Sequence, residues 1–230
     1  MVFVGRGALL WRAVQFAVGS GLAVDFVFTD DALGPGRHRA LGVPTKFIED
    51  INLESELIDK HCKDRTVWSI DNSMIFRDPF FALKLRCYNI HNGLLPAYRG
   101  RAAVAVLFAI LNCEKEYGAT LHEVDRGIDT GAPLDVERYA IHEGDRFHDV
   151  MMRGVGACGR LFEKNVVRVS AGAARPMASA EPRACEGYYG LKQLRELRRF
   201  ADHPNFARAT DLGMFGHYFP EVVQAIAAAR

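Results

Sequence analysis

The segment 1–70 alternates between short apolar runs and stretches whose apolar residues recur at helical spacing. Strands are expected at Met1–Gly5, Leu22–Phe28, Val43–Phe47 and Thr66–Ile70. Helices are expected at Ala8–Val18 and Asn52–His61, and a loop or broken helix at Ala32–Ala40. Asn52 is the expected N-cap of its helix. Such alternation is typical of a mostly parallel, twisted sheet with helices on both faces, so the sequence predicts an α/β fold whose ligands lie beyond the carboxyl ends of the strands.

The second half has a different texture. Residues 87–101 are rich in turn-forming residues, and the elements that follow are longer. Helices are expected at Ala102–Leu111 and Asp149–Val167, and strands at Ala119–Val124 and Pro133–Ile141. The first of these helices is apolar all round, which predicts that it is buried.

Small residues and prolines dominate the stretch 170–185, which is typical of a linker. We therefore expect a main domain at 1–169, a linker at 170–185 and a short helical and aromatic extension at 186–230. Within the extension, Gly187–Ala201 has the leucine spacing of a charged helix, and residues 203–223 are aromatic and rich in turns.

The charge and the cysteine usage exclude some classes of protein. Lys and Arg number 29 and Asp and Glu 28, which gives a net charge of +1. This balance argues against a nucleic-acid partner and against an anionic membrane surface, because both need a basic face. The 5 cysteines are scattered and never spaced as C-x-x-C, so we expect no metal and a reducing, cytoplasmic location.

The N-terminal stretch has an early arginine and apolar residues, as a signal peptide does. Arg12 and Gln15 interrupt the apolar run, and the chain continues directly into the next expected strand. A strand, a turn and an amphipathic helix explain this stretch better, and no apolar run reaches the length needed to span a bilayer.

Two polar side chains stand out in the turn-rich segment. In extended backbone, Asn89 and His91 project to one face while Ile90 points to the other. An amide and an imidazole side by side are suited to hold a carbonyl oxygen that is becoming an alkoxide. A second polar loop, 125–131, follows another expected strand, which brings the carboxylate of Asp129 toward the same edge of the sheet.

At this point the sequence resembles a known family. The motifs that carry the resemblance are Asn89-Ile90-His91, Leu94-Leu95-Pro96 with Tyr98-Arg99-Gly100, Gly118-Ala119-Thr120 with His122, and Asp125 with Gly127-Ile128-Asp129-Thr130-Gly131. They are similar to the catalytic domain of the folate-dependent formyltransferases, which act on methionyl-tRNA, glycinamide ribonucleotide or sugar nucleotides. The resemblance is strongest over 66–141 and implies a Rossmann-like sheet, with 1–169 as the catalytic domain.

The resemblance also implies roles. Asn89, His91 and Asp129 match the catalytic positions of the family. Asn89 and His91 are expected to bind the formyl oxygen, and Asp129 to orient His91 and favour its charged form. The amine must lose a proton as it attacks, and His91 or Asp129 is expected to take it. His122 is expected to have a structural role.

The formyl donor that the resemblance implies is N10-formyltetrahydrofolate. Its pterin is expected between a strand over Trp68–Phe76 and the loop that contains Asp129. The cofactor-binding residues expected by position are Ser73, Met74, Ile75, Val124, Asp125 and Gly127. Plain core packing explains Met74 and Ile75 equally well.

One departure from the family pattern bears on the acceptor. Asn92-Gly93 stands where the family often has Pro-Ser, which loosens the turn and removes a hydroxyl. The stretch beyond the linker is short for a tRNA-binding domain, and Gly5 and Gly7 match a phosphate-binding loop poorly. We expect a small-molecule amine, with an amino sugar nucleotide ahead of an amino-acid-type amine of peptide or siderophore biosynthesis. A homodimer stays open.

Three other functions remain as alternatives. A hydrolase that releases formate from the same donor uses the same three residue types, although such enzymes carry an extra N-terminal domain. A non-catalytic folate-binding module is a second alternative, and the presence of Asn89, His91 and Asp129 argues against it because such a module does not need them. A plain nucleotide-binding protein is disfavoured because Leu10 stands where a third glycine belongs.

Overall fold

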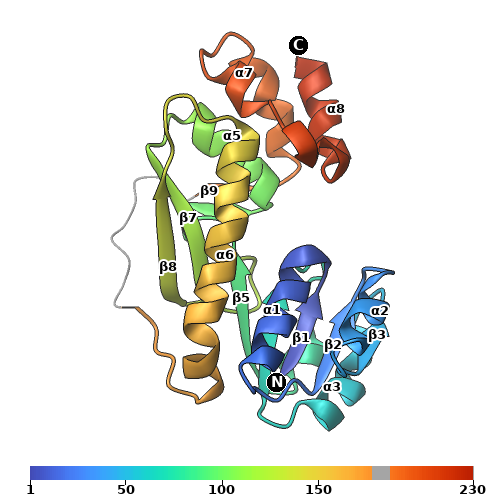
Figure 1. Ribbon diagram of the computed structural model, residues 1–230. Coiled ribbons are helices and arrows are strands. Elements are labelled where there is room, and N and C mark those ends of the chain that lie inside the picture. The colour runs from blue at the N-terminus through green and yellow to red at the C-terminus, as the bar shows by residue number, and fades with distance from the viewer. Residues whose placement is uncertain (178–186, 230) are drawn as a thin grey trace.

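The computed structural model describes residues 1–177 and 187–229 and has a seven-stranded sheet at its centre (Figure 1). The strands are β1 (Val2–Gly5), β2 (Phe26–Thr29), β3 (Thr45–Phe47), β4 (Thr66–Ile70), β5 (Arg86–His91), β7 (Glu116–Glu123) and β8 (Pro133–Ala140). Their order in the sheet is β3-β2-β1-β4-β5-β7-β8. The first five are parallel, and β7 and β8 join the far side as antiparallel strands. The predicted mostly parallel α/β sheet is therefore confirmed.

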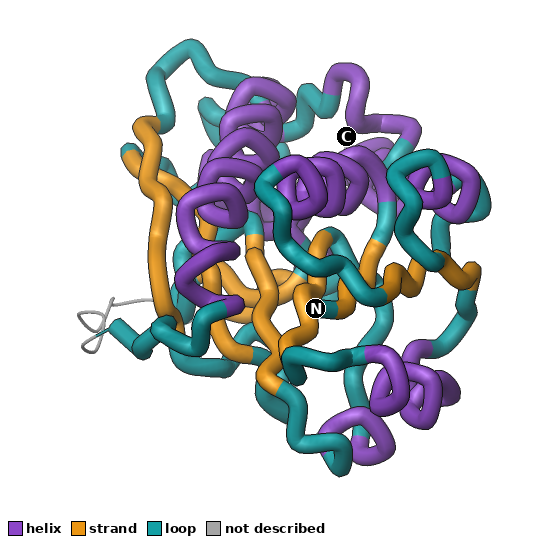
Figure 2. Tube along the Cα trace, turned by 60° about the horizontal axis from the view of Figure 1, so that its bottom comes forward, coloured by secondary structure: helices purple, strands orange, loops and turns teal. Residues whose placement is uncertain are grey.

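Helices lie on both faces of the sheet, as Figure 2 shows. The α-helices are α1 (Gly7–Gly19), α2 (Gly34–Arg39), α3 (Ser55–His61), α4 (Asp78–Phe81), α5 (Ala102–Leu111), α6 (Phe147–Ser170), α7 (Phe206–Ala209) and α8 (Pro220–Ala229). The 3₁₀ helices are η1 (Ile51–Glu54), η2 (Gln193–Phe200) and η3 (Gly213–His217). None of the helices in the described ranges combines the length and the apolarity needed to cross a bilayer.

Two hydrophobic clusters sandwich the parallel strands. Phe3 of β1 packs with α1 and α6 on one face, while Val2 and Val4 pack with α3 and α4 on the other. Every residue of β1 and β4 is buried, which is what a parallel strand covered on both faces requires. The continuous apolar runs of the sequence thus correspond to strands with no solvent-facing side.

The C-terminal segment packs onto α5. Nine of the ten residues of α5 are buried, and they share one cluster with Leu194 and Leu197 of η2 and with α7 and α8. A two-stranded sheet adds to this contact, because β9 (Gly187–Tyr189) pairs in parallel with β6 (Tyr98–Gly100). The turn-rich segment that follows β5 is therefore held from its outer side by the end of the chain.

Several predicted elements differ from the structure. The predicted charged helix at Gly187–Ala201 is wrong in its first turn, which is strand β9, and Gln193–Phe200 is a 3₁₀ helix. The predicted N-cap Asn52 is also wrong, since Asp50 accepts the backbone N–H of Asn52 and caps a 3₁₀ turn ahead of α3. Much of the predicted linker, 178–185, lies outside the described residues, so the boundary at 169 stays a prediction.

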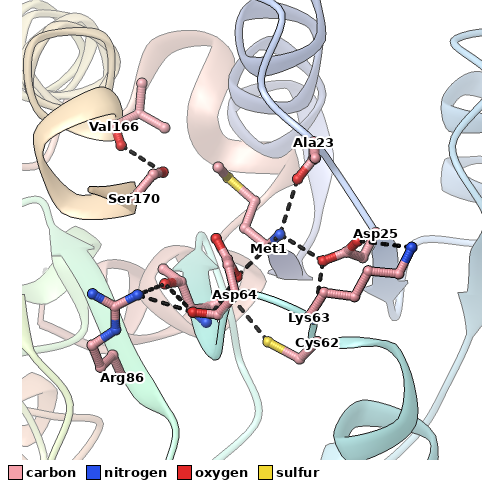
Figure 3. Close-up of polar contacts among 10 residues, drawn as sticks. Met1, Ala23, Asp25, Cys62, Lys63, Asp64, Arg86, Val166 and Ser170 are labelled. Atoms are coloured by element: carbon pink, nitrogen blue, oxygen red, sulfur yellow. Dashed lines mark hydrogen bonds and ion pairs between the residues drawn. The ribbon is translucent and has the colours of Figure 1, made fainter. Parts of the chain in front are cut away.

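The amino edge of the parallel strands holds a compact polar group (Figure 3). The Met1 ammonium donates to the Ala23 carbonyl at 2.9 Å and to the Asp25 carboxylate at 2.7 Å, and lies 3.2 Å from Asp64. Asp25 also accepts the backbone N–H of Lys63 at 3.3 Å. These contacts tie the start of β1 to the segments that precede β2 and β4.

Candidate active site

The strand β5 lies where the parallel and antiparallel halves of the sheet meet. Its side chains alternate, so that Tyr88 and Ile90 enter the cluster formed with α1 and α6. Asn89 and His91 therefore project from the opposite face, as period two predicts. The antiparallel register places His122 of β7 opposite Asn89.

The predicted carboxylate reaches the same place from the loop after β7. Asp129 has a left-handed backbone with φ of 53°, and its Oδ2 accepts the backbone N–H of Gly100 at 2.8 Å. The same oxygen lies 3.6 Å from Nδ1 of His91, and Oδ1 lies 3.6 Å from Nε2 of His122. The loop and the two strands thus bring one carboxylate between two imidazoles.

The far side of the His91 ring determines where its proton sits. Nε2 lies 2.6 Å from the Tyr98 carbonyl oxygen, which can only accept a hydrogen bond. Nε2 therefore carries the proton, and in the neutral ring Nδ1 holds a lone pair that faces Asp129. An imidazole held in this way can accept a further proton at Nδ1, beside a negative charge that stabilises the product.

His122 is held in the complementary tautomer. Its Nδ1 lies 2.7 Å from the Glu123 carbonyl, so that Nδ1 donates and Nε2 is left to accept. The amide nitrogen of Asn89 lies 3.0 Å from this Nε2 and donates to it. The second N–H of the Asn89 amide remains for another acceptor. His122 therefore positions the Asn89 amide, in line with the expected structural role, and its Nε2 also lies 3.6 Å from Asp129, a proximity that only the strand register reveals.

Burial governs the charge of this group. It lowers the pKa of His91 below its ordinary value, and this effect outweighs the Asp129 charge and the Tyr98 carbonyl, which raise it. Burial alone raises the pKa of Asp129, but the His91 imidazole, His122 and the Gly100 N–H together lower it to about 2. At neutral pH the pair is a neutral imidazole beside a carboxylate. Asp129 raises the pKa of His91 and so favours its charged form, as expected, but burial lowers this pKa by more.

The residues expected to line a folate pocket come from two segments. Met74 and Val124 pack against the same apolar cluster, which brings the two segments together. Ile75 is exposed, with 53% of its surface accessible, so core packing does not account for it. The Ser73 hydroxyl donates to Asp30 at 2.7 Å.

Asp125 and Gly127 belong to a tight turn in the loop that carries Asp129. Asp125 accepts the Gly127 N–H at 3.0 Å and the Thr130 hydroxyl at 2.6 Å. The expected strand over 68–76 is shorter than predicted, because β4 ends at Ile70 and Asp71 adopts a left-handed backbone with φ of 48°. In the part of the chain that the structure describes, no group of three His, Cys, Asp or Glu side chains is arranged to hold a metal ion.

Comparison with known families finds one match over this region. Residues 77–164, which include β5, β7 and the Asp129 loop, match the formyl transferase family. The matched stretch is therefore similar to a formyl transferase domain. The resemblance read from the sequence motifs is thus confirmed.

The names of the curated relatives that the chain matches differ in the acceptor. The chain is 32% identical over 114 residues to the methionyl-tRNA formyltransferase of Kosmotoga olearia, an overlap of 49% of this chain and 36% of that protein. It is 36% identical over 84 residues to the GDP-perosamine N-formyltransferase of Brucella melitensis, an overlap of 36% of this chain and 32% of that one. The chain thus spans about a third of the length of these relatives.

Solved structures show the same fold over most of the chain. A sugar N-formyltransferase from Shewanella sp. superimposes with a TM-score of 0.74 at 23% identity, covering 94% of this chain and 89% of that one. A 4-N formyltransferase from Francisella tularensis gives a TM-score of 0.73 at 20% identity and covers 91% and 86%. The likeness extends beyond residues 77–164 to the parallel strands and to part of the C-terminal segment.

Proposed function

We propose that the chain is an N-formyltransferase that moves a formyl group from N10-formyltetrahydrofolate to the amine of a small molecule. The observation that carries the proposal is the placement of Asn89, His91 and Asp129 around one point, with His122 as the link between them. An amide donor, a neutral imidazole and a carboxylate are the groups that acyl transfer to an amine needs. The formyl transferase match over 77–164 supports the same reaction.

The proposed chemistry proceeds through a tetrahedral intermediate. The neutral amine attacks the formyl carbon, a C–N bond forms, and the formyl oxygen takes the electron pair. The free N–H of Asn89 donates to this oxygen, and a donor of this kind contributes about 2.7–4 kcal/mol of barrier lowering. The carbon–N10 bond then breaks and the electron pair leaves with N10.

His91 moves the proton in this scheme. The attacking nitrogen gives up a proton to the bare Nδ1 of His91, and the imidazolium that forms faces Asp129 at 3.6 Å. The Tyr98 carbonyl stabilises the same cation from Nε2. When the intermediate collapses, Nδ1 gives the proton to the N10 leaving group. The acceptor amine has then exchanged one hydrogen for the formyl group, and N10 has gained that hydrogen. The lowered pKa of His91 keeps the imidazole in its basic form at neutral pH.

We further propose that Ser73, Met74 and Ile75 line one side of the folate pocket and Val124, Asp125 and Gly127 the other. The shared packing of Met74 and Val124 and the exposure of Ile75 support this assignment. The test is substitution of Ile75 by Asp, for which we expect a raised KM for the donor and an unchanged KM for the acceptor. An unchanged KM for the donor excludes Ile75 from the pocket.

The acceptor we propose is an amino sugar linked to a nucleotide. A relative is a GDP-perosamine N-formyltransferase, and a fold neighbour from Helicobacter canadensis was solved with folinic acid and dTDP-3-aminofucose, at 19% identity and a TM-score of 0.71. An amino-acid-type amine is the second acceptor class. The sequence-based expectation of a small-molecule amine thus has support from both comparisons.

The experiment that tests the proposal incubates the protein with N10-formyltetrahydrofolate and a panel of amines. The panel holds amino sugars linked to dTDP, GDP and UDP, amino acids and methionyl-tRNA, and mass spectrometry detects a gain of one formyl group. Transfer to a sugar nucleotide supports the full proposal, and transfer to another amine corrects the acceptor class. Formate release at the same rate with and without any amine assigns a hydrolase instead.

A further inference from the structure

Gly93 lies against the imidazole of His91, two residues further along the chain. A Cβ atom at Gly93 would lie 2.4 Å from Nε2 of His91 and 2.6 Å from the Tyr98 carbonyl oxygen. Both distances are far shorter than carbon atoms tolerate. Gly93 does not have a positive φ, so the close contacts with the ring and with the Tyr98 carbonyl are what require glycine here.

The imidazole therefore occupies the space that a side chain at position 93 would fill. In that space Nε2 reaches the Tyr98 carbonyl at 2.6 Å, and the same placement turns Nδ1 toward Asp129. The His91 side chain is almost fully buried, with 6% of its surface exposed. The orientation of the His91 ring thus depends on the absence of a Cβ atom at Gly93.

The turn around Gly93 is fastened on both sides, so it has little freedom to yield. The carbonyl of Gly93 accepts the Thr120 hydroxyl at 2.7 Å, and the carbonyl of Asn92 accepts the Tyr117 hydroxyl at 3.3 Å. The buried Asn92 side chain donates to the sulfur of Met151 at 3.3 Å.

Helix α6 closes the remaining side of the turn. A Cβ at Gly154 of α6 would lie 2.2 Å from Oδ1 of Asn92, so the helix backbone lies directly on this side chain. A side chain added at Gly93 therefore meets both the Tyr98 carbonyl and the His91 ring, and of these two the ring is the one that can rotate away.

We propose that Gly93 is a positioning residue for the reaction, which sets the His91 ring with Nε2 on the Tyr98 carbonyl and Nδ1 toward the attacking amine. The step through the amine rests on the proposed function, whereas the orientation of the ring does not. A side chain at position 93 turns the imidazole off the Tyr98 carbonyl and out of line with Asp129.

The first test is Gly93→Ala, with Gly159→Ala as the matched control. Gly159 lies in α6, and a Cβ there has no atom within 4 Å. Misplacing a reacting group by about 1 Å costs up to roughly 100-fold in rate, so we expect kcat of Gly93→Ala to fall about 10- to 100-fold. We expect both KM values to stay close to those of the unmodified protein. The Gly159→Ala variant should keep its kcat.

A second readout does not depend on the reaction. NMR titration of the His91 ring should give a pKa closer to the ordinary value of 6.5 in Gly93→Ala, because the displaced ring is less buried. The Gly159→Ala control should titrate as the unmodified protein does. An unchanged His91 titration in Gly93→Ala overturns the proposal. If the unmodified protein formylates no amine, this titration still tests the position of the ring.

A third measurement covers the case in which Gly93→Ala folds poorly. The loss in Tm caused by Gly93→Ala is compared in the unmodified protein and in a His91→Ala background. We expect a smaller loss in the second, because the ring that meets the new Cβ is gone while the Tyr98 carbonyl remains. Equal losses in both backgrounds show that the backbone alone requires glycine and contradict the assignment.

Discussion

Two partly buried carboxylate groups lie at opposite edges of the same sheet, and they have different partners. At the amino edge, Asp25 and Asp64 surround the ammonium of Met1, which is also bonded to a backbone carbonyl (Figure 3). At the carboxyl end of β5, Asp129 lies between two imidazoles at 3.6 Å from each. The first group pairs carboxylates with a charged donor, and the second pairs a carboxylate with rings that are held by other acceptors.

The difference shows what makes a buried carboxylate useful for chemistry. The Met1 ammonium donates directly to Asp25 at 2.7 Å, so this carboxylate already has a charged hydrogen-bond donor. Nδ1 of His91, in contrast, holds a lone pair toward Asp129 at a distance longer than a hydrogen bond. Adding a proton there turns an unfavourable contact into an ion pair. The amino edge is therefore suited to stabilise the fold, and the β5 site to carry the proposed proton transfer.

Among the substitutions that test this difference, His91→Gln should have the largest effect on the reaction rate. A glutamine amide can still donate to the Tyr98 carbonyl, but it offers no basic nitrogen to the amine. General-base catalysis contributes roughly 100- to 10,000-fold, so we expect kcat to fall at least about 100-fold. Steady-state kinetics with the acceptor found in the amine panel measures this. A variant that folds normally and keeps its kcat would show that His91 takes no proton.

The substitution Asp129→Asn should have the next largest effect. It removes the charge that stabilises the imidazolium, while its amide oxygen can still accept the Gly100 N–H. If the carboxylate stabilises the imidazolium through charge attraction by about 1.4–2.7 kcal/mol, kcat falls roughly 10- to 100-fold without it. A loss in KM alone would instead place Asp129 in substrate binding.

The same variant should change how stability depends on pH. Because the folded-state pKa of Asp129 is lowered from 3.8 to about 2, the carboxylate stabilises the fold above that range, and this contribution is lost as pH falls from 3.8 toward 2. A shift of this size corresponds to about 2 kcal/mol. Urea unfolding between pH 5 and pH 2 should show a shallower loss of stability in Asp129→Asn, since the amide does not titrate.

The sequence predicted which residues come together in most of this candidate site. It did not predict the contacts that depend on strand register or on the orientation of a ring. The shared face of Asn89 and His91 follows from strand periodicity, and Asp129 followed from the family motif. His122 was assigned a structural role because its position opposite Asn89 depends on the pairing of β5 with β7. The role proposed for Gly93 depends on how the His91 ring packs, which cannot be read from the spacing of residues in the sequence.

The fold was predictable where contacts are local. Apolar runs and helical periods located β1, β4 and α5, because each buries its own side chains on a regular pattern. Strand β9 was missed since its partner β6 lies far away in the sequence, and the pair Tyr188-Tyr189 with a following leucine pattern also suits a helix. Pairing with a strand that is distant in the sequence therefore outweighed the local helix propensity of this segment.

The pH dependence of the reaction should sharpen the contrast by showing which form of His91 acts. If the neutral ring is the base, kcat/KM falls about tenfold for each pH unit below the pKa of His91 and is level above it. Burial places this pKa below the ordinary 6.5, so the level region includes neutral pH. A rate that instead falls as pH rises through this pKa assigns the charged ring as donor to the formyl oxygen. The ratio of the rates in H2O and in D2O, measured in the level region, then tests whether this proton is transferred in the rate-limiting step.

Asp25→Asn, at the other edge of the sheet, should have the smallest effect on the rate. It weakens the bond from the Met1 ammonium and leaves Asp64 and the Ala23 carbonyl as partners. We expect a loss of about 1–3 kcal/mol in the free energy of unfolding, measured in urea. The rate per folded molecule should stay within about twofold, because distant sites without shared partners act independently. A large loss of kcat in a fully folded Asp25→Asn protein would mean that the two edges are coupled through β1 and β4, and the division between a stabilising edge and a reactive one would then fail.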